Sequence, residues 1–231
     1  MNGPPSGAGS LDGTRAVGLA AAVGISAWFA HSPWLYPLKL LGIMMHESGH
    51  ALAALLVGGS VEAVVLESVH AGHCLSRIPD GFLPRLVVFS AGYLGNAVAA
   101  AALVVLTFRH RAHRFVQWAM VAWLLVMGVL YAGTWFTRGF CLGTALLLAA
   151  AARWLPTAAG AWLNLFIAGY AVVDVGVSLV QGLWVRSLVT DADLLWERSF
   201  VPPWISIAGW TVLTFAILGW AGGYTLRGRR A

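Results

Sequence analysis

The sequence predicts an all-α polytopic membrane protein with about six or seven transmembrane helices and a short β-like hairpin after the second helix. The chain has 231 residues, of which 59% are hydrophobic and only 10% charged, whereas a soluble domain carries about 25% charge. Its mean hydropathy is +0.78. Arginines punctuate long apolar runs, which fits the flanks of membrane spans and not a nucleic-acid surface. We therefore expect an integral, multi-pass protein whose partner is the lipid bilayer.

The chain divides into one membrane domain between two short tails. Residues 1–15 are rich in glycine, proline and serine, which predicts a disordered N-terminal tail. Residues 16–226 form the predicted membrane domain, and residues 227–231 a basic C-terminal tail. The apolar run 16–30 is predicted to be a first membrane helix. Its short length and the preceding Arg15 also fit the core of a signal peptide, which is the alternative.

The second predicted helix, from Pro37 to about Val57, carries the motif His-Glu-Ser-Gly-His over residues 46–50. Residues four apart share a helix face, so His46 and His50 can bind one Zn²⁺ ion. Such an ion lowers the pKa of a bound water to roughly 7, and Glu47 can then act as general base. The alternative is a chance match, or two helix histidines that are hydrogen-bonded to neighbouring helices. An acidic residue inside a membrane helix costs roughly 2.5–3.5 kcal/mol, however, which favours a functional role.

The region from Ser60 to Pro84 differs from its surroundings because it is β-leaning and contains polar residues. We interpret it as a short hairpin beside the metal-binding helix and not as a membrane span. His70, His73 and Cys74 in this region are candidates for a second metal site. Their spacing matches no standard zinc pattern, which makes that site the weaker alternative.

The remaining apolar runs predict further helices. Arg138-Gly139 is expected to interrupt one of them, and a polar stretch from Ser187 to Pro203 separates the last two. The expected helices are Leu86–Phe108, Phe115–Thr137, a short Phe140–Ala152, Thr157–Val185 and Trp204–Leu226.

A catalytic zinc site has three protein ligands, so a carboxylate must join the two histidines. Asp174 lies in the middle of a span, at the expected depth, and a carboxylate buried in a membrane is a functional candidate. Asp191 lies in the polar stretch between the last two spans, where it is alternatively the N-cap of a short helix. Depth alone favours Asp174, and both candidates stay open on this ground.

Three segments carry a resemblance to a known family. HESGHALAALLVGG, SAGYLGNAV and TDADLLWE, the last followed by Pro-Pro-Trp, resemble the bacterial and plant membrane metallopeptidases related to the site-2 proteases. The resemblance runs from about Ile43 to Trp210. Thr190-Asp191-Ala192 matches the Ser-Asp-Ala pattern of that family, with Thr for Ser. Better-known site-2 proteases have Leu-Asp-Gly in a membrane helix instead, and the predicted membrane domain, residues 16–226, lacks this tripeptide; Leu11-Asp12-Gly13 lies in the predicted tail.

The resemblance implies a fold, a reaction and a ligand set. It ranks Asp191 ahead of Asp174 as the third zinc ligand beside His46 and His50. It implies a zinc metalloendopeptidase of the bacterial plasma membrane that cleaves membrane protein substrates, with Glu47 as the catalytic base. The alternative function is a membrane protein that uses the metal for structure or transport and cleaves nothing. Such a protein has no need of Glu47, so this residue favours the enzyme.

Overall fold

A computed structural model describes residues 13–29, 32–67, 71–109, 112–184 and 190–226. Residues 1–12 and 227–231, which hold most of the predicted tails, lie outside this range, as does His70. The first helix, α1, begins at Gly13, inside the stretch predicted as tail.

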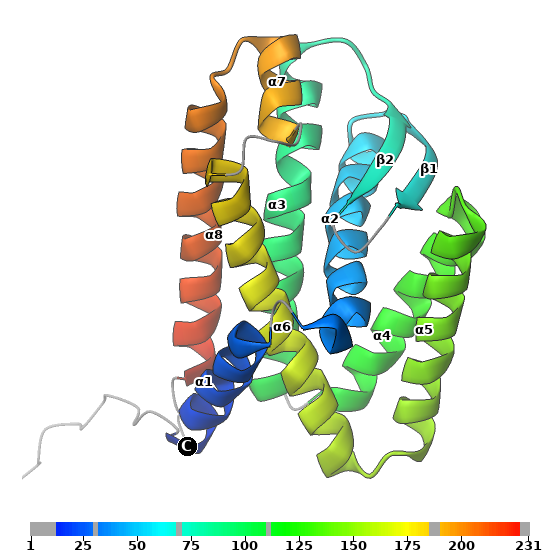
Figure 1. The fold of residues 1–231 in the computed structure, drawn as a ribbon, viewed down its shortest axis with the longest axis vertical. Coiled ribbons are helices and arrows are strands. Elements are labelled where there is room, and N and C mark those ends of the chain that lie inside the picture. Colours follow the sequence, from blue (N-terminus) through cyan, green and yellow to red (C-terminus); the bar gives the residue numbers. More distant parts are fainter. Residues whose placement is uncertain (1–12, 30–31, 68–70, 110–111, 185–189, 227–231) are drawn as a thin grey trace, which may run out of the picture.

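The chain forms a bundle of helices with one hairpin at its flank (Figure 1). A 3-10 turn, Pro33–Leu35, precedes α2, and π-helical turns at Val105–Arg109 and Met127–Tyr131 extend α3 and α4. The elements are α1 (Gly13–Trp28), α2 (Tyr36–Leu56), β1 (Ser60–Leu66), β2 (Gly72–Arg77), α3 (Phe82–Val104), α4 (His113–Val126), α5 (Trp135–Trp154), α6 (Thr157–Trp184), α7 (Asp191–Ser199) and α8 (Pro203–Leu226).

Among the described residues, five helices are long and apolar enough to cross a membrane: α3 and α4 with their π-helical extensions, α5, most of α6, and α8. A shorter apolar helix, Val17–Trp28, precedes them. The 21-residue α2 is not one of the five, because its two histidines, Glu47 and Lys39 lower its hydropathy. The predicted fold class, all-α and polytopic with a short hairpin, is confirmed.

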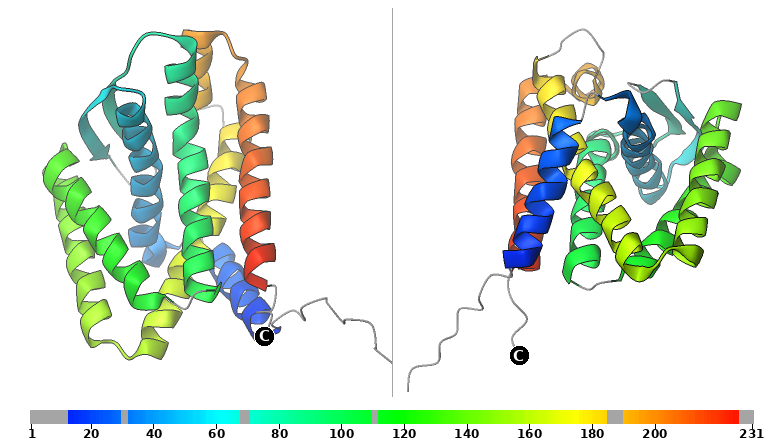
Figure 2. Two further views of the ribbon diagram at one scale, coloured as in Figure 1. Left: turned by 180° about the vertical axis from the view of Figure 1, so that it is seen from behind. Right: turned by 60° about the horizontal axis from the view of Figure 1, so that its bottom comes forward.

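Helices α2 and α3 lie side by side near the middle of the bundle (Figures 1 and 2). Small residues permit this close approach. A Cβ placed on Gly49 of α2 would overlap the backbone of Ala91 in α3, and one placed on Gly95 of α3 would come 3.2 Å from the Cα of Gly49. The motif of α2 therefore packs directly on the Ala91–Gly95 segment, and that contact determines which residues surround the two histidines.

The predicted hairpin is present as an antiparallel pair, β1 and β2, that lies across α2. Leu66 pairs with Gly72 next to the turn and Ser60 with Arg77 at the open end. Gly58, at φ +82°, ends α2 and begins the connection to β1. In Figure 1, β2 lies on the α2 side of the hairpin and β1 lies toward α4 and α5.

The boundary predicted between the fourth and fifth helices was wrong. The chain leaves the π-helical turn after Tyr131, and α5 runs through Arg138 without a break. Two local contacts explain the position of the break. Thr134 caps α5 by accepting a hydrogen bond from the amide of Thr137, and the amide of Gly133 donates to the carbonyl of Val64 in β1 at 2.9 Å.

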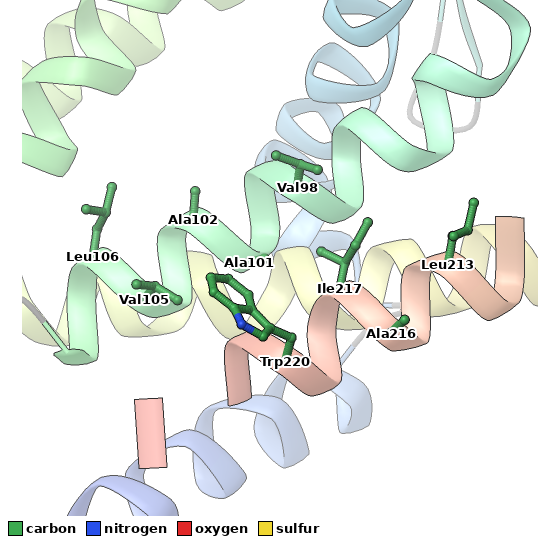
Figure 3. A pocket seen from close by; sticks show the side chains of 9 residues that line it. All are labelled: Val98, Ala101, Ala102, Val105, Leu106, Leu213, Ala216, Ile217 and Trp220. Atoms are coloured by element: carbon green, nitrogen blue, oxygen red, sulfur yellow. The ribbon is translucent and has the colours of Figure 1, made fainter. Parts of the chain in front are cut away.

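An apolar groove of about 640 Å³ runs between α3 and α8 (Figure 3). Its walls include Val98 on α3, Leu106 in the π-helical turn that extends α3, and Leu213 and Trp220 on α8. Both helices are candidate membrane spans. Exposed apolar side chains on such helices are what a lipid-facing surface requires.

Candidate metal centre

The two histidines of the predicted motif project from one face of α2. His50 is buried and His46 is partly buried. Their Nε2 atoms lie 3.1 Å apart. The spacing of four residues on a regular helix places both rings on one face of α2, and this part of the arrangement follows from local sequence alone.

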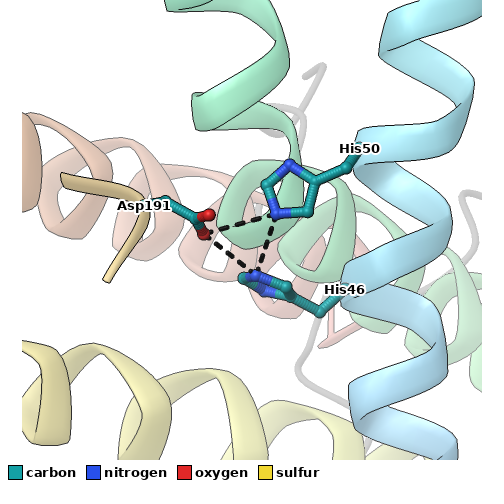
Figure 4. A group of neighbouring side chains, drawn as sticks. All are labelled: His46, His50 and Asp191. Atoms are coloured by element: carbon teal, nitrogen blue, oxygen red, sulfur yellow. Dashed lines mark hydrogen bonds and ion pairs between the residues drawn. The ribbon is translucent and has the colours of Figure 1, made fainter. Parts of the chain in front are cut away.

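Asp191 reaches the two histidines from the first turn of α7 (Figure 4). The predicted alternative, in which Asp191 caps this helix, was wrong: Thr190 is the N-cap. The carboxylate of Asp193 accepts from the Thr190 amide at 2.9 Å, and the Thr190 side chain accepts from the amide of Asp193. This capping box leaves the Asp191 carboxylate free to face α2.

The three candidate ligand atoms form a compact triangle. Oδ2 of Asp191 lies 3.1 Å from Nε2 of His46 and 3.3 Å from Nε2 of His50. Ligands at about 2.0–2.2 Å from a tetrahedral zinc lie about 3.4 Å from one another. Two imidazole nitrogens and one carboxylate oxygen at this spacing fit three corners of such a site. Within the described ranges, this is the only group of three or more His, Cys, Asp and Glu side chains close enough to share an ion.

The Nδ1 atom of His50 makes a hydrogen bond that determines which ring nitrogen keeps a free lone pair. Nδ1 lies 2.7 Å from the carbonyl oxygen of Val88 on α3. A carbonyl oxygen can only accept, so Nδ1 donates its proton there and Nε2 is left with the lone pair that a metal requires.

Gly92 on α3 lies against the imidazoles of both histidines. A Cβ at this position would overlap Nε2 of both His46 and His50. A side chain there would occupy the space in which a shared ion has to sit. The segment SAGYLGN carries part of the family resemblance, but nothing in the sequence showed that Gly92 lies against both imidazoles.

The structure separates Asp174 from this triangle. Its carboxylate lies against Gly42, one helical turn before His46, where a Cβ would overlap it. Asp174 is also hydrogen-bonded to Asn96 and has its strongest charge interaction with His46. Of the two aspartates proposed as third ligand, the structure thus brings Asp191 to the histidines. Asp174 lies instead against Gly42, outside the triangle.

Charge interactions support an ionised Asp191 in the triangle. Burial would raise the pKa of Asp191, but His50 and His46 outweigh this effect and hold the pKa below its ordinary value. A carboxylate in this state is the form that binds a divalent metal.

Glu47 lies beside the triangle and under the hairpin. Its side chain is 6% exposed. A Cβ on Gly72 of β2 would lie 3.3 Å from Cγ of Glu47, so β2 passes directly over this residue. The glutamate therefore has the metal position on one side and an extended strand on the other.

The second cluster proposed in the hairpin has little support among the described residues. His73 is paired with Glu67 at 2.9 Å. Burial, together with the negative charge of Glu47, raises the pKa of the Cys74 thiol to about 12, so the thiolate that a zinc site requires is disfavoured.

Comparison with known proteins gives one positive result. Neither the curated proteins nor the solved structures include a match to this chain. The family described as Peptidase M50B-like matches residues 19–221. That range includes α2, the hairpin, α7 and most of α8, so it contains every residue of the site described above. The chain belongs to the Peptidase M50B-like family.

Proposed function

We propose that this protein is an intramembrane zinc endopeptidase of the bacterial plasma membrane. Its substrates are membrane proteins, which it cleaves in or near their transmembrane segments. The observation that carries the proposal is the triangle of His46, His50 and Asp191 with the carboxylate of Glu47 on the residue next to His46. Membership of a peptidase family and five helices that could cross a membrane also support the proposal.

Each residue has a separate chemical task. His46, His50 and Asp191 would hold Zn²⁺ and leave its fourth position open. When bound there, Zn²⁺ supplies Lewis acidity that polarises the scissile carbonyl and makes water a stronger nucleophile at neutral pH. Glu47 accepts a proton from the attacking water and passes it to the leaving amine.

A transmembrane substrate has to unwind before this chemistry can occur, because helical hydrogen bonds hide its carbonyl groups. We propose that the unwound segment pairs with β2 as an added strand. The outer edge of β1 is already bonded, through Val64 to Gly133 at 2.9 Å and through Leu66 to Thr137 at 2.9 Å. No backbone hydrogen bond to the outer edge of β2 occurs in the described part of the chain, and β2 passes over Glu47.

The alternative is a membrane protein that keeps the metal for structure or transport. Such a protein requires the three ligands but gains nothing from a buried carboxylate at Glu47. Buried charge inside a membrane protein is costly. The 6% exposure of Glu47 next to the ligands therefore favours the hydrolytic function.

The test combines metal analysis with a cleavage assay. Purified protein is reconstituted in proteoliposomes with a panel of single-span membrane peptides, and products are identified by mass spectrometry. We expect one equivalent of zinc, and cleavage by the wild type but not by Glu47→Gln. Zinc binding without cleavage of any peptide would favour the alternative function, and absence of zinc would exclude both.

A further inference from the structure

Tyr93 on α3 contacts the metal-binding face without being a ligand. It follows Gly92, the residue that abuts both imidazoles. The Tyr93 ring meets the His46 ring edge-on, with centroids 4.8 Å apart and an interplanar angle of 87°. Tyr93 is therefore in direct ring contact with His46, a candidate metal ligand.

A second contact fixes the orientation of the same ring. Tyr93 stacks on Trp210 of α8, with centroids 5.1 Å apart and an angle of 21°. The indole Nε1 of Trp210 donates to Oγ of Ser90 at 2.9 Å. Trp210 is 4% exposed, so the aromatic support beneath Tyr93 is buried and hydrogen-bonded.

The phenol group is within the electrostatic range of the charged groups of the site. Its strongest charge interactions are with Asp191 and Glu47, followed by Asp193. The candidate third ligand and the proposed base therefore both act on the phenol electrostatically, while its ring lies against His46. The hydroxyl itself has no hydrogen bond to any described residue. A neutral tyrosine hydroxyl can donate one hydrogen bond, and here the donor has no acceptor among the residues that the structure describes.

We propose that Tyr93 is a further catalytic residue, which donates a hydrogen bond to the oxygen that becomes negatively charged when water attacks the scissile carbonyl. This inference rests on the proposed peptidase function. Tyr93 keeps its proton throughout. A C–O bond forms between water and the carbonyl carbon, the C–N bond breaks, and the proton released by water moves through Glu47 to the leaving amine. A fixed donor at that oxygen stabilises the transition state more than the substrate.

The competing explanation is that Tyr93 only fills space between His46 and Trp210. Tyr93→Phe separates the two roles, because phenylalanine keeps the ring and its stacking and removes only the hydroxyl. Tyr224→Phe is the matched control. Tyr224 also stacks on a tryptophan of α8, Trp220, with centroids 5.6 Å apart. That pair lies about 15 Å further along the helix.

The experiment uses Co²⁺-loaded protein in detergent and follows the visible absorption of the ion. The two probes are dimethylphosphinate, a tetrahedral anion with two oxygen atoms, and acetate, a planar anion. We expect Tyr93→Phe to bind one equivalent of Co²⁺ with an unchanged spectrum. Its affinity for dimethylphosphinate is expected to fall at least about tenfold, as for loss of one hydrogen bond to an anion, while its affinity for acetate changes much less. Tyr224→Phe is expected to match the wild type with both probes.

Three results would overturn the proposal. Equal responses of wild type and Tyr93→Phe to dimethylphosphinate, including no response in either, would remove Tyr93 from this role and leave the peptidase function intact. Loss of Co²⁺ from Tyr93→Phe would assign the hydroxyl to support of the metal site. Absence of Co²⁺ from the wild type would instead refute the metal centre, and this inference with it.

Discussion

Oδ2 of Asp191 lies 3.1 Å from Nε2 of His46, although 145 residues separate them in the chain. The contact joins α7, a nine-residue helix, to α2. It joins a carboxylate to the two-histidine motif in a group that could hold a metal ion, and it favours Asp191 over Asp174 as the candidate third ligand.

The choice of aspartate predicts different metal affinities for two variants. Asp191→Ala, like His46→Ala and His50→Ala, removes an atom of the triangle. We expect zinc affinity to fall by more than the roughly 10–100-fold that loss of a hydrogen-bond partner of a metal ligand costs. Asp174→Ala removes a carboxylate that lies against Gly42 and Asn96, and it is expected to retain one equivalent. Competition with a chromophoric chelator measures both. Zinc retained by Asp191→Ala and lost by Asp174→Ala would reverse the assignment.

The role of Glu47 predicts that binding and catalysis separate. Glu47→Gln keeps the size of the side chain but cannot accept a proton from water, so zinc is expected to stay at one equivalent. We expect turnover of any cleaved peptide to fall roughly 10²–10⁴-fold. Turnover within a few-fold of the wild type would exclude Glu47 as the base.

Gly92 predicts a steric test of the metal position. In Gly92→Ala the new methyl group would overlap Nε2 of both histidines, and overpacking of this kind costs about 1–3 kcal/mol. We expect zinc affinity to fall about tenfold or more. Gly143→Ala is the matched control, because a Cβ at Gly143 on α5 meets nothing within 4 Å. Isothermal titration of the apo-proteins with zinc compares the two, and equal affinities would show that the ion does not sit against Gly92.

Thr137 predicts that the hairpin depends on α5. Its side chain is 0% exposed, and Oγ1 accepts a hydrogen bond from the Leu66 amide at 2.9 Å. Thr137→Val keeps the shape and leaves that buried amide without an acceptor, which costs about 1–3 kcal/mol. We expect a lower Tm in detergent and faster hydrogen exchange in β1. In the control, Thr211→Val, the hydroxyl that is lost donates only to Ile207 of its own helix. If both variants melted at the same temperature as the wild type, the contact to Leu66 would have no role in stability.

The sequence by itself determined the features that depend on local spacing and composition. Low charge and long apolar runs predicted the membrane class. The four-residue interval between His46 and His50 placed both rings on one helix face, because helical periodicity needs no tertiary contact. The β-leaning residues after Gly59 predicted the hairpin, and the structure contains it as Ser60–Leu66 and Gly72–Arg77.

Tertiary structure alone decided the features that depend on contacts between distant segments. The sequence placed the fourth helix boundary at Arg138-Gly139, but the bond from Gly133 to Val64 in β1 ends the preceding segment earlier. Depth in the membrane favoured Asp174. The packing of α6 directs that side chain to Gly42, and the capping box of α7 leaves Asp191 free to face His46 and His50. Neither outcome can be derived from local spacing, because each results from how helices far apart in the chain pack against α2.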